Sequence, residues 1–173
     1  MALTITPVAG SSGGVQSDYN LRIGKARLGA SYDLSDNTSR SKVNAAGSVL
    51  AFGQPVSSHG EGKIRNYTKA NGFSGFLYLS DTFVPANKTS TINSVSKTLP
   101  GYPDKYMANV CEMGTIWVYA NTAVTERGVV ALLDAGGDAV VASGTTNSTD
   151  IDAYFLASAA AGELVPIQLN GII

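Results

Sequence analysis

The sequence predicts a mainly β protein: a jelly-roll-like, sandwich or barrel body with one short helix and an extended N-terminal arm. Hydrophobic residues make up 44% of the 173 residues, whereas charged residues make up only 14%. The apolar residues come in short, β-prone runs, which is typical of strands. Gly, Ser, Thr and Asn separate the runs, and these residues favour turns.

The chain divides into an arm and a body. Residues 1–18 contain a β-prone segment, Leu3–Val8, followed by Ala9–Gly14, whose Gly and Ser residues are typical of a flexible linker. Residues 19–173 have the length of one β-rich domain. The arm is expected either to fray or add a short strand to the body, or to become ordered on a partner. The partner-contact candidates in the arm are its apolar residues and the proline: Leu3, Ile5, Pro7 and Val8.

The first half of the body contains four candidate strands. Tyr19–Ile23 alternates, and its apolar face includes two further contact candidates, Tyr19 and Leu21. Ala26–Tyr32 continues this pattern weakly, and Ser48–Phe52 is a compact run that ends at a glycine. Gly75–Leu79 is apolar on both faces, as expected for a strand packed on two sides.

The second half begins with the clearest strand, Thr115–Ala120, which places Ile116 and Val118 on one face and Trp117 and Tyr119 on the other. Two further runs, Gly128–Leu133 and Ala139–Ala142, flank Asp134–Asp138, a turn signal of the hairpin kind.

The chain closes with two runs, Asp152–Ala157 and Leu164–Leu169, joined by a tight connection at residues 159–162. Pro166 lacks an N–H donor, so the last strand is predicted to lie at a sheet edge or to carry a bulge, where Pro166 could contact a partner.

One helix is predicted, from Asp104 to Met113. Asp104 would cap it, and Tyr106, Val110 and Met113 fall at i, i+4 and i+7. Residues 34–47 and 85–100 are polar and rich in Ser, Asn and Thr, which predicts long loops.

Composition argues against several partners. The formal net charge is −1 and there is no basic tract, so no nucleic-acid partner is expected. The N-terminus lacks a signal-peptide pattern and no apolar run reaches the roughly 18 residues of a membrane span, so no membrane association is expected. Cys111 is the only cysteine, which rules out an internal disulfide and favours a buried thiol.

Candidate catalytic chemistry is sparse. Gly10–Gly14 matches the G-x-S-x-G pattern around Ser12, but no helix pattern follows, and His59 is the only histidine available as a base. His59 has no His or Cys partner for a metal, and the spaced Asp residues follow no EF-hand pattern. We therefore expect no catalytic residue, metal, cofactor or small-molecule substrate, with a Ser12–His59 hydrolase as a rival.

Tyrosines suggest a second rival. Tyr102 and Tyr106 lie beside prolines and could form an aromatic platform for sugars, as in a lectin, or could simply pack in the core or an interface. Both are therefore candidates for partner contact.

From Tyr19 onward the chain resembles the small structural cement, or decoration, proteins of tailed bacteriophage heads. Three stretches carry the resemblance: residues 19–29, residues 114–119 followed by 124–130, and residues 153–169 with their Ala-Gly-Glu-Leu-Val turn between two strands. The resemblance implies a non-enzymatic protein with a jelly-roll or β-tulip-like body.

The resemblance also implies a partner and a location. Such proteins bind the major capsid protein on the outside of an assembled head and bridge neighbouring capsomers. They work as homo-oligomers, with a dimer favoured and a trimer as the alternative. The expected location is the exterior of the virion capsid, assembled in the cytoplasm of the host bacterium. The alternatives are a lectin-like receptor-binding module and another virion structural module from head completion or the tail.

Overall fold

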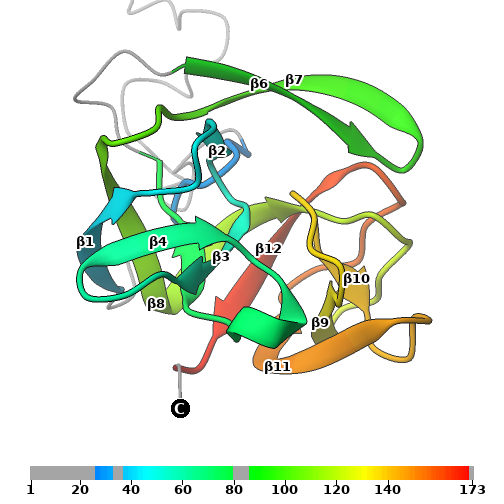
Figure 1. Cartoon of the computed structure of the whole chain (residues 1–173). Helices are drawn as coiled ribbons and strands as arrows, with labels where there is room; N and C mark the ends of the chain where they lie inside the picture. The colour runs from blue at the N-terminus through cyan, green and yellow to red at the C-terminus, as the bar shows by residue number, and fades with distance from the viewer. Residues whose placement is uncertain (1–25, 33–36, 80–85, 172–173) are drawn as a thin grey trace, which may run out of the picture.

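A computed structural model describes residues 26–32, 37–79 and 86–171 (Figure 1). Twelve strands and one short 3-10 helix are formed by these residues. They are, in chain order, β1 Thr38–Asn44, β2 Leu50–Ala51, β3 Pro55–Ser58, β4 Lys63–Asn66, η1 Lys69–Asn71, β5 Gly75–Leu77, β6 Ala86–Ile92, β7 Val95–Tyr102, β8 Met107–Tyr119, β9 Val129–Leu133, β10 Val141–Ala142, β11 Ser148–Phe155 and β12 Leu164–Leu169.

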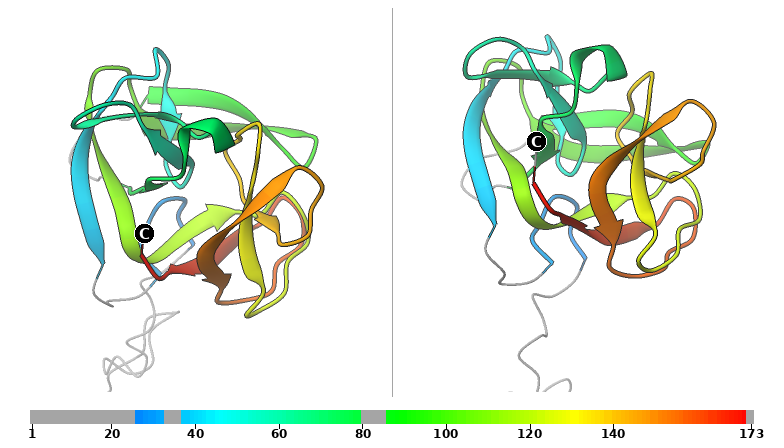
Figure 2. Two further views of the ribbon diagram at one scale, coloured as in Figure 1. Left: turned by 60° about the horizontal axis from the view of Figure 1, so that its bottom comes forward. Right: turned by 90° about the horizontal axis from the view of Figure 1, so that it is seen from below.

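The long strand β8 organises the fold, because a nine-stranded sheet closes on it twice. In one ring, β8 pairs with β5 and with β1, and the order β1-β4-β3-β5-β8 completes the circle. In the other, β8 continues into the order β12-β11-β9-β10, and a bridge between Ala120 and Val140 leads back to the end of β8. Figure 2 shows β1 alongside β8, with β9 and β11 on the opposite side.

Each ring has its own hydrophobic core. Ile116, Val118 and Ile167 belong to the cluster enclosed by β8–β12, and Val110 and Ile64 belong to the cluster on the β1–β5 side. Adjacent residues of β8 face different cores, since Val110 lies in the second cluster whereas Cys111 lies in the first, together with Ile116 and Val118.

A separate three-stranded sheet, in the order β2-β7-β6, covers the second core (Figure 1). Its hairpin β6–β7 turns on Asn93 and Ser94, which both have positive φ, as a two-residue type I′ turn requires. At its other end Gly101 lies against β2, where an added Cβ would stand 2.1 Å from the Leu50 carbonyl oxygen. A side chain at this position would therefore push β2 and β7 apart.

Most predicted strands are confirmed. All of Thr115–Ala120 but its last residue lies in β8, with Ile116 and Val118 fully buried, and Gly75–Leu79 contains β5, whose three residues are all buried. The predicted hairpin around Asp134–Asp138 joins β9 to β10. Ser48–Phe52 contains the two-residue β2, and the two closing runs contain the second half of β11 and all of β12.

The predicted helix at Asp104–Met113 is wrong, because residues from Met107 onward form the first half of β8. The apolar residues of this short segment fit both helical and strand spacing. In the structure Ala108 and Val110 are buried and Asn109 between them is partly exposed, which is the two-residue period of a strand. Pairing with β1 along six register positions decides the outcome. Asp104 accepts from the Gly47 N–H across two turns instead of capping a helix.

The two predicted long loops are also strands. Residues 38–44 form β1, and residues 86–100 form β6 and most of β7. The exposed polar residues of both segments suggested loops. Their threonines, however, have high β propensity, which favours the strands that form. In contrast, the weak strand at Ala26–Tyr32 is wrong, since these residues form turns that bond to the main chain of Trp117. The predicted strand Tyr19–Ile23 lies outside the described residues.

Pro166 is not at an edge, and no bulge is present in its strand. β12 lies between β8 and β11, without a register shift in either ladder. The ladder between β11 and β12 ends at the pair Phe155–Ile167. Pro166 comes just past this pair, so the N–H that it lacks is not needed by β11. The Pro166 carbonyl still accepts from the N–H of Leu156 at 2.9 Å.

Among the described residues, no helix is long and apolar enough to cross a membrane.

Candidate functional site

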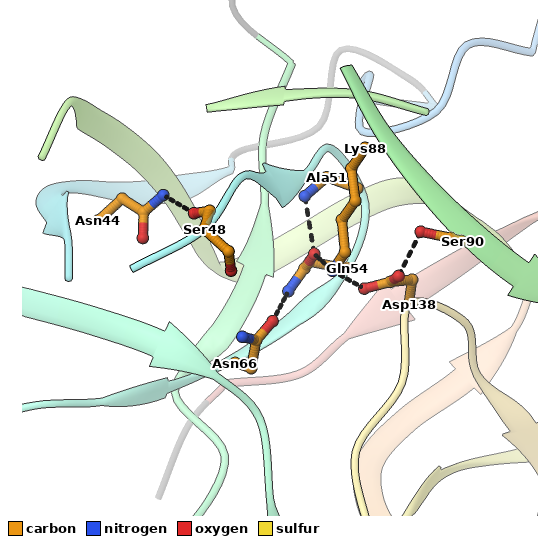
Figure 3. Close-up of polar contacts among 8 residues, drawn as sticks. All are labelled: Asn44, Ser48, Ala51, Gln54, Asn66, Lys88, Ser90 and Asp138. Carbon is orange, nitrogen blue, oxygen red and sulfur yellow. Dashed lines mark hydrogen bonds and ion pairs between the residues drawn. The ribbon is translucent and has the colours of Figure 1, made fainter. Parts of the chain in front are cut away.

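Asn44, the last residue of β1, is fully buried and ties two turns together. Its Nδ2 donates to the carbonyl oxygens of Ser48 (2.9 Å, Figure 3), Tyr102 (3.0 Å) and Pro103 (3.0 Å). Its Oδ1 accepts from the Ala46 N–H at 2.9 Å. The two amide hydrogens are thus shared among three carbonyls, and every polar atom of this side chain is satisfied.

The second of these turns presents two exposed apolar side chains. Tyr106 and Met107 are each 58% exposed, the largest fraction among the large hydrophobic residues of the described chain. Main-chain hydrogen bonds to Asn44 fix the backbone of this turn. The Asn44 N–H donates to the Tyr106 carbonyl at 2.9 Å, and the Asn44 carbonyl accepts from the Lys105 N–H at 2.8 Å. This Tyr106–Met107 pair is a candidate for contact with a partner, because tyrosine is favoured at interfaces.

A second exposed apolar pair lies in the other ring. Val129 of β9 and Tyr154 of β11 are register partners, 44% and 37% exposed. The remaining exposed large hydrophobics of the described chain are Tyr32, Val95 and Met113, which are not register partners of one another. Single exposed hydrophobics are ordinary on protein surfaces, so the two pairs are the features of interest.

A partly buried polar network joins β6 to the body (Figure 3). The Lys88 ammonium donates to Asp138 Oδ1 at 2.7 Å and to Gln54 Oε1 at 3.1 Å, and the Ser90 hydroxyl donates to the other oxygen of Asp138. Gln54 also accepts from the Ala51 N–H at 2.7 Å. The network fixes the three-stranded sheet over the second core.

Within the described ranges, the residue types that could catalyse or bind metal are dispersed or already hydrogen-bonded. His59 is exposed after β3, and Ser12 lies outside the described residues. Residues 26–32, 37–79 and 86–171 contain no group of three His, Cys, Asp or Glu side chains placed to hold a metal ion. Asp150 accepts from Ser143 at 2.8 Å and Asp152 accepts from Asn170 at 2.8 Å, so both serve loop structure.

Three pKa shifts have structural causes. The Asp134 carboxylate accepts hydrogen bonds from the Thr149 hydroxyl and from the Lys69 ammonium. Both lower the pKa of Asp134, and the hydrogen bond from Thr149 has the larger effect. Burial, with a smaller contribution from Asp134, raises the pKa of Tyr67. Burial raises the pKa of Cys111 to about 12, which makes the thiol unreactive, as its predicted burial implied.

The structure separates the sequence-predicted contact residues. Tyr106 is exposed, but Tyr102 is fully buried, packs edge-on against Phe52 at 5.1 Å and donates to the Tyr78 carbonyl. Tyr102 and Tyr106 therefore form no sugar platform together. Pro166 is also buried, so its side chain offers no contact surface. The six other candidates lie outside the described residues: Leu3, Ile5, Pro7, Val8, Tyr19 and Leu21.

Sequence reasoning missed Asn44 and Met107. Asn44 fell in a predicted loop, where asparagine is unremarkable, and its burial depends on contacts with residues 102–103, far along the chain. Met107 carried a local signal, because two adjacent large apolar residues cannot both face the core of one strand.

The comparisons with known proteins agree with this architecture. Residues 15–170 match the protein family described as "Structural cement protein (E217 gp24/Pam3 gp6)". A chain in the solved structure "The capsid of Myoviridae Phage XM1" superimposes with a TM-score of 0.61 at 15% identity, covering 95% of this chain and 99% of that one. No curated protein matches the sequence. Since the family match spans nearly the whole body, the chain belongs to the phage structural cement protein family.

Proposed function

We propose that this cement protein binds the outer surface of an assembled phage head, acts as a homo-oligomer, and bridges neighbouring capsomers of the major capsid protein. The observation that carries the proposal is the Tyr106–Met107 pair in a member of this family: a fixed apolar anchor with no core of its own to fill. Adhesion needs such anchors rather than a cleft, because a few well-placed residues supply most binding energy.

Bridging follows from the energetics of two linked contacts. Once one site of an oligomer binds a capsomer, the second binds as an intramolecular event, which raises avidity by about 10² to 10⁴. Copies placed across joints would then resist separation of the capsomers.

The test uses heads that lack this protein and adds the purified chain. The double variant Tyr106→Ser/Met107→Ser is expected to lower head occupancy at least tenfold in co-sedimentation, and to remove the rise in shell melting temperature. Val129→Ser/Tyr154→Ser removes a comparable exposed pair from β9 and β11 and serves as the matched control. Equal occupancy for the wild type and the Tyr106–Met107 variant would exclude this pair as the anchor, and no wild-type binding to heads would exclude the function itself.

The N-terminal arm is a second proposed contact, through Leu3, Ile5, Pro7 and Val8. Its extended β-prone sequence is suited to strand addition, in which main-chain hydrogen bonds provide affinity. Deleting residues 2–14 is expected to reduce occupancy on heads. Unchanged occupancy and shell melting temperature would remove the arm from the mechanism.

A further inference from the structure

The strand β6 leaves one edge unpaired in the described part of the chain. The three-stranded sheet has the order β2-β7-β6, so β6 pairs only with β7. Its register with β7 is regular over all seven residues, from Ala86↔Gly101 to Ile92↔Val95, with no bulge. A regular edge of this length is a ready template for another strand.

The hairpin turn determines which groups face that edge. In a two-residue turn the flanking pair, here Ile92↔Val95, exchanges hydrogen bonds, and the pairs then alternate along the ladder. Asn87, Thr89 and Thr91 therefore direct their N–H and C=O groups away from β7. The Pro100 carbonyl, opposite Asn87, supports this phase, because it accepts from Phe52 on the far side of β7 at 2.9 Å.

Natural edge strands usually carry features that prevent pairing, such as an outward or inward charged side chain, a proline or a bulge. β6 has neither proline nor bulge, and its three outward side chains, Asn87, Thr89 and Thr91, are exposed and uncharged. Lys88 is its one charged residue and faces the body, where Asp138 neutralises the ammonium (Figure 3). The one inward-pointing charge that could protect this edge is therefore neutralised within the body.

We propose that the occupant of this edge is β6 of a second copy, paired antiparallel about a two-fold axis at Thr89. The midpoint of Ala86–Ile92 is Thr89, so full overlap pairs Thr89 with itself and Asn87 with Thr91 of the other copy. All three of these positions point their main-chain groups outward, so each becomes a hydrogen-bonded pair, and the joint forms roughly six main-chain hydrogen bonds. An isologous contact of this kind closes a dimer instead of extending a filament.

This dimer rests on the proposed function for its role, because it would supply the two capsid sites that bridging needs. The perpendicular two-fold keeps both bodies on the same side of the joined sheet. The exposed Thr and Asn side chains of both copies then form one continuous outer face.

Disulfide trapping tests the joint directly. In Thr89→Cys, the two Cα atoms are expected about 5.5 Å apart, within disulfide range. Mild oxidation should give a covalent dimer on a non-reducing gel. Thr98→Cys is the matched control: it lies opposite Thr89 on the same face but on the inner strand β7, about 14 Å from its counterpart at the spacing of strands in a sheet. Cys111 is buried and should not react.

A second variant addresses the hydrogen bonds. Thr89→Pro removes one outward N–H and leaves the β7 ladder intact, so sedimentation velocity should show a shift from dimer to monomer with unchanged circular dichroism, whereas Thr89→Ala should stay dimeric. A monomeric wild type, or equal trapping of Thr89→Cys and Thr98→Cys, would overturn the inference. These measurements use no heads, so they separate the joint from the proposed function: a wild type that is oligomeric in solution but gives no Thr89→Cys trapping would refute the joint and leave homo-oligomeric head binding standing.

Discussion

At the scale of single residues, Asn44 shows how one buried polar side chain fixes a surface feature. Replacement by alanine would leave the carbonyls of Ser48, Tyr102 and Pro103 and the Ala46 N–H without this partner. Each unsatisfied buried group costs about 1 kcal/mol or more. Asn44→Ala is therefore expected to lower the free energy of unfolding by about 3 kcal/mol in urea titrations.

Asn109→Ala is the matched control for Asn44. Asn109 lies in β8 and accepts one exposed hydrogen bond from Ser41, so its replacement should cost less than about 1 kcal/mol. Similar losses for the two variants would mean that the shared-donor geometry of Asn44 contributes nothing special.

Asp134 is expected to make the stability of the folded protein depend on pH in the acid range. The folded state lowers the pKa of its carboxyl through Thr149 and Lys69, so the folded state binds a proton less readily than the unfolded chain. The stability from these contacts is present above the unfolded pKa, about 3.9, and is lost as the pH falls below that value. Asp134→Asn should therefore lower the melting temperature at pH 7 and converge with the wild type near pH 2. A constant difference across this range would contradict the assignment, and Asp150→Asn controls for loss of a carboxylate.

At the scale of elements, the Lys88–Asp138 pair holds the β6–β7 hairpin on the body. Both side chains are largely shielded, 22% and 13% exposed, so removing one leaves a poorly solvated charge. Asp138→Ala is expected to cost about 2 kcal/mol and to speed hydrogen exchange in β6 and β7.

The surface pair Lys69–Asp134, 58% and 29% exposed, provides the comparison. Double-mutant cycles should give a smaller coupling energy for Lys69–Asp134 than for Lys88–Asp138. Equal coupling would show that shielding does not strengthen the second pair.

The elements also show how far sequence reasoning reached. Strands with strong apolar alternation, such as Thr115–Ala120, were predictable because local pattern and tertiary burial agree. β1 and the β6–β7 hairpin were missed because their exposed polar face resembles a loop, and the first half of β8 because ten residues fit both periods. Asn44 depends on a turn some sixty residues away, which no local pattern contains. Tyr106 was predicted as a contact candidate and Met107 was not, although the two adjacent large apolar residues carried a local signal.

At the scale of the whole molecule, two rings share one strand, and the nearly neutral surface follows from the composition. Only 14% of residues are charged and the formal net charge is −1, so long-range attraction to another protein is weak. Binding must then depend on apolar contact and on hydrogen bonds, which salt screens little.

Salt dependence therefore provides a test at this scale. Head binding by the wild type is expected to change less than about threefold in Kd between 50 and 500 mM NaCl, because salt shortens the Debye length from about 14 Å to about 4 Å without touching apolar contacts. Co-sedimentation with heads at both salt concentrations measures this, with Tyr106→Ser/Met107→Ser showing the weakened apolar contact at either concentration. A tenfold or greater loss of affinity at high salt would instead assign the adhesion to charged groups, and the Tyr106–Met107 pair would then be incidental to it.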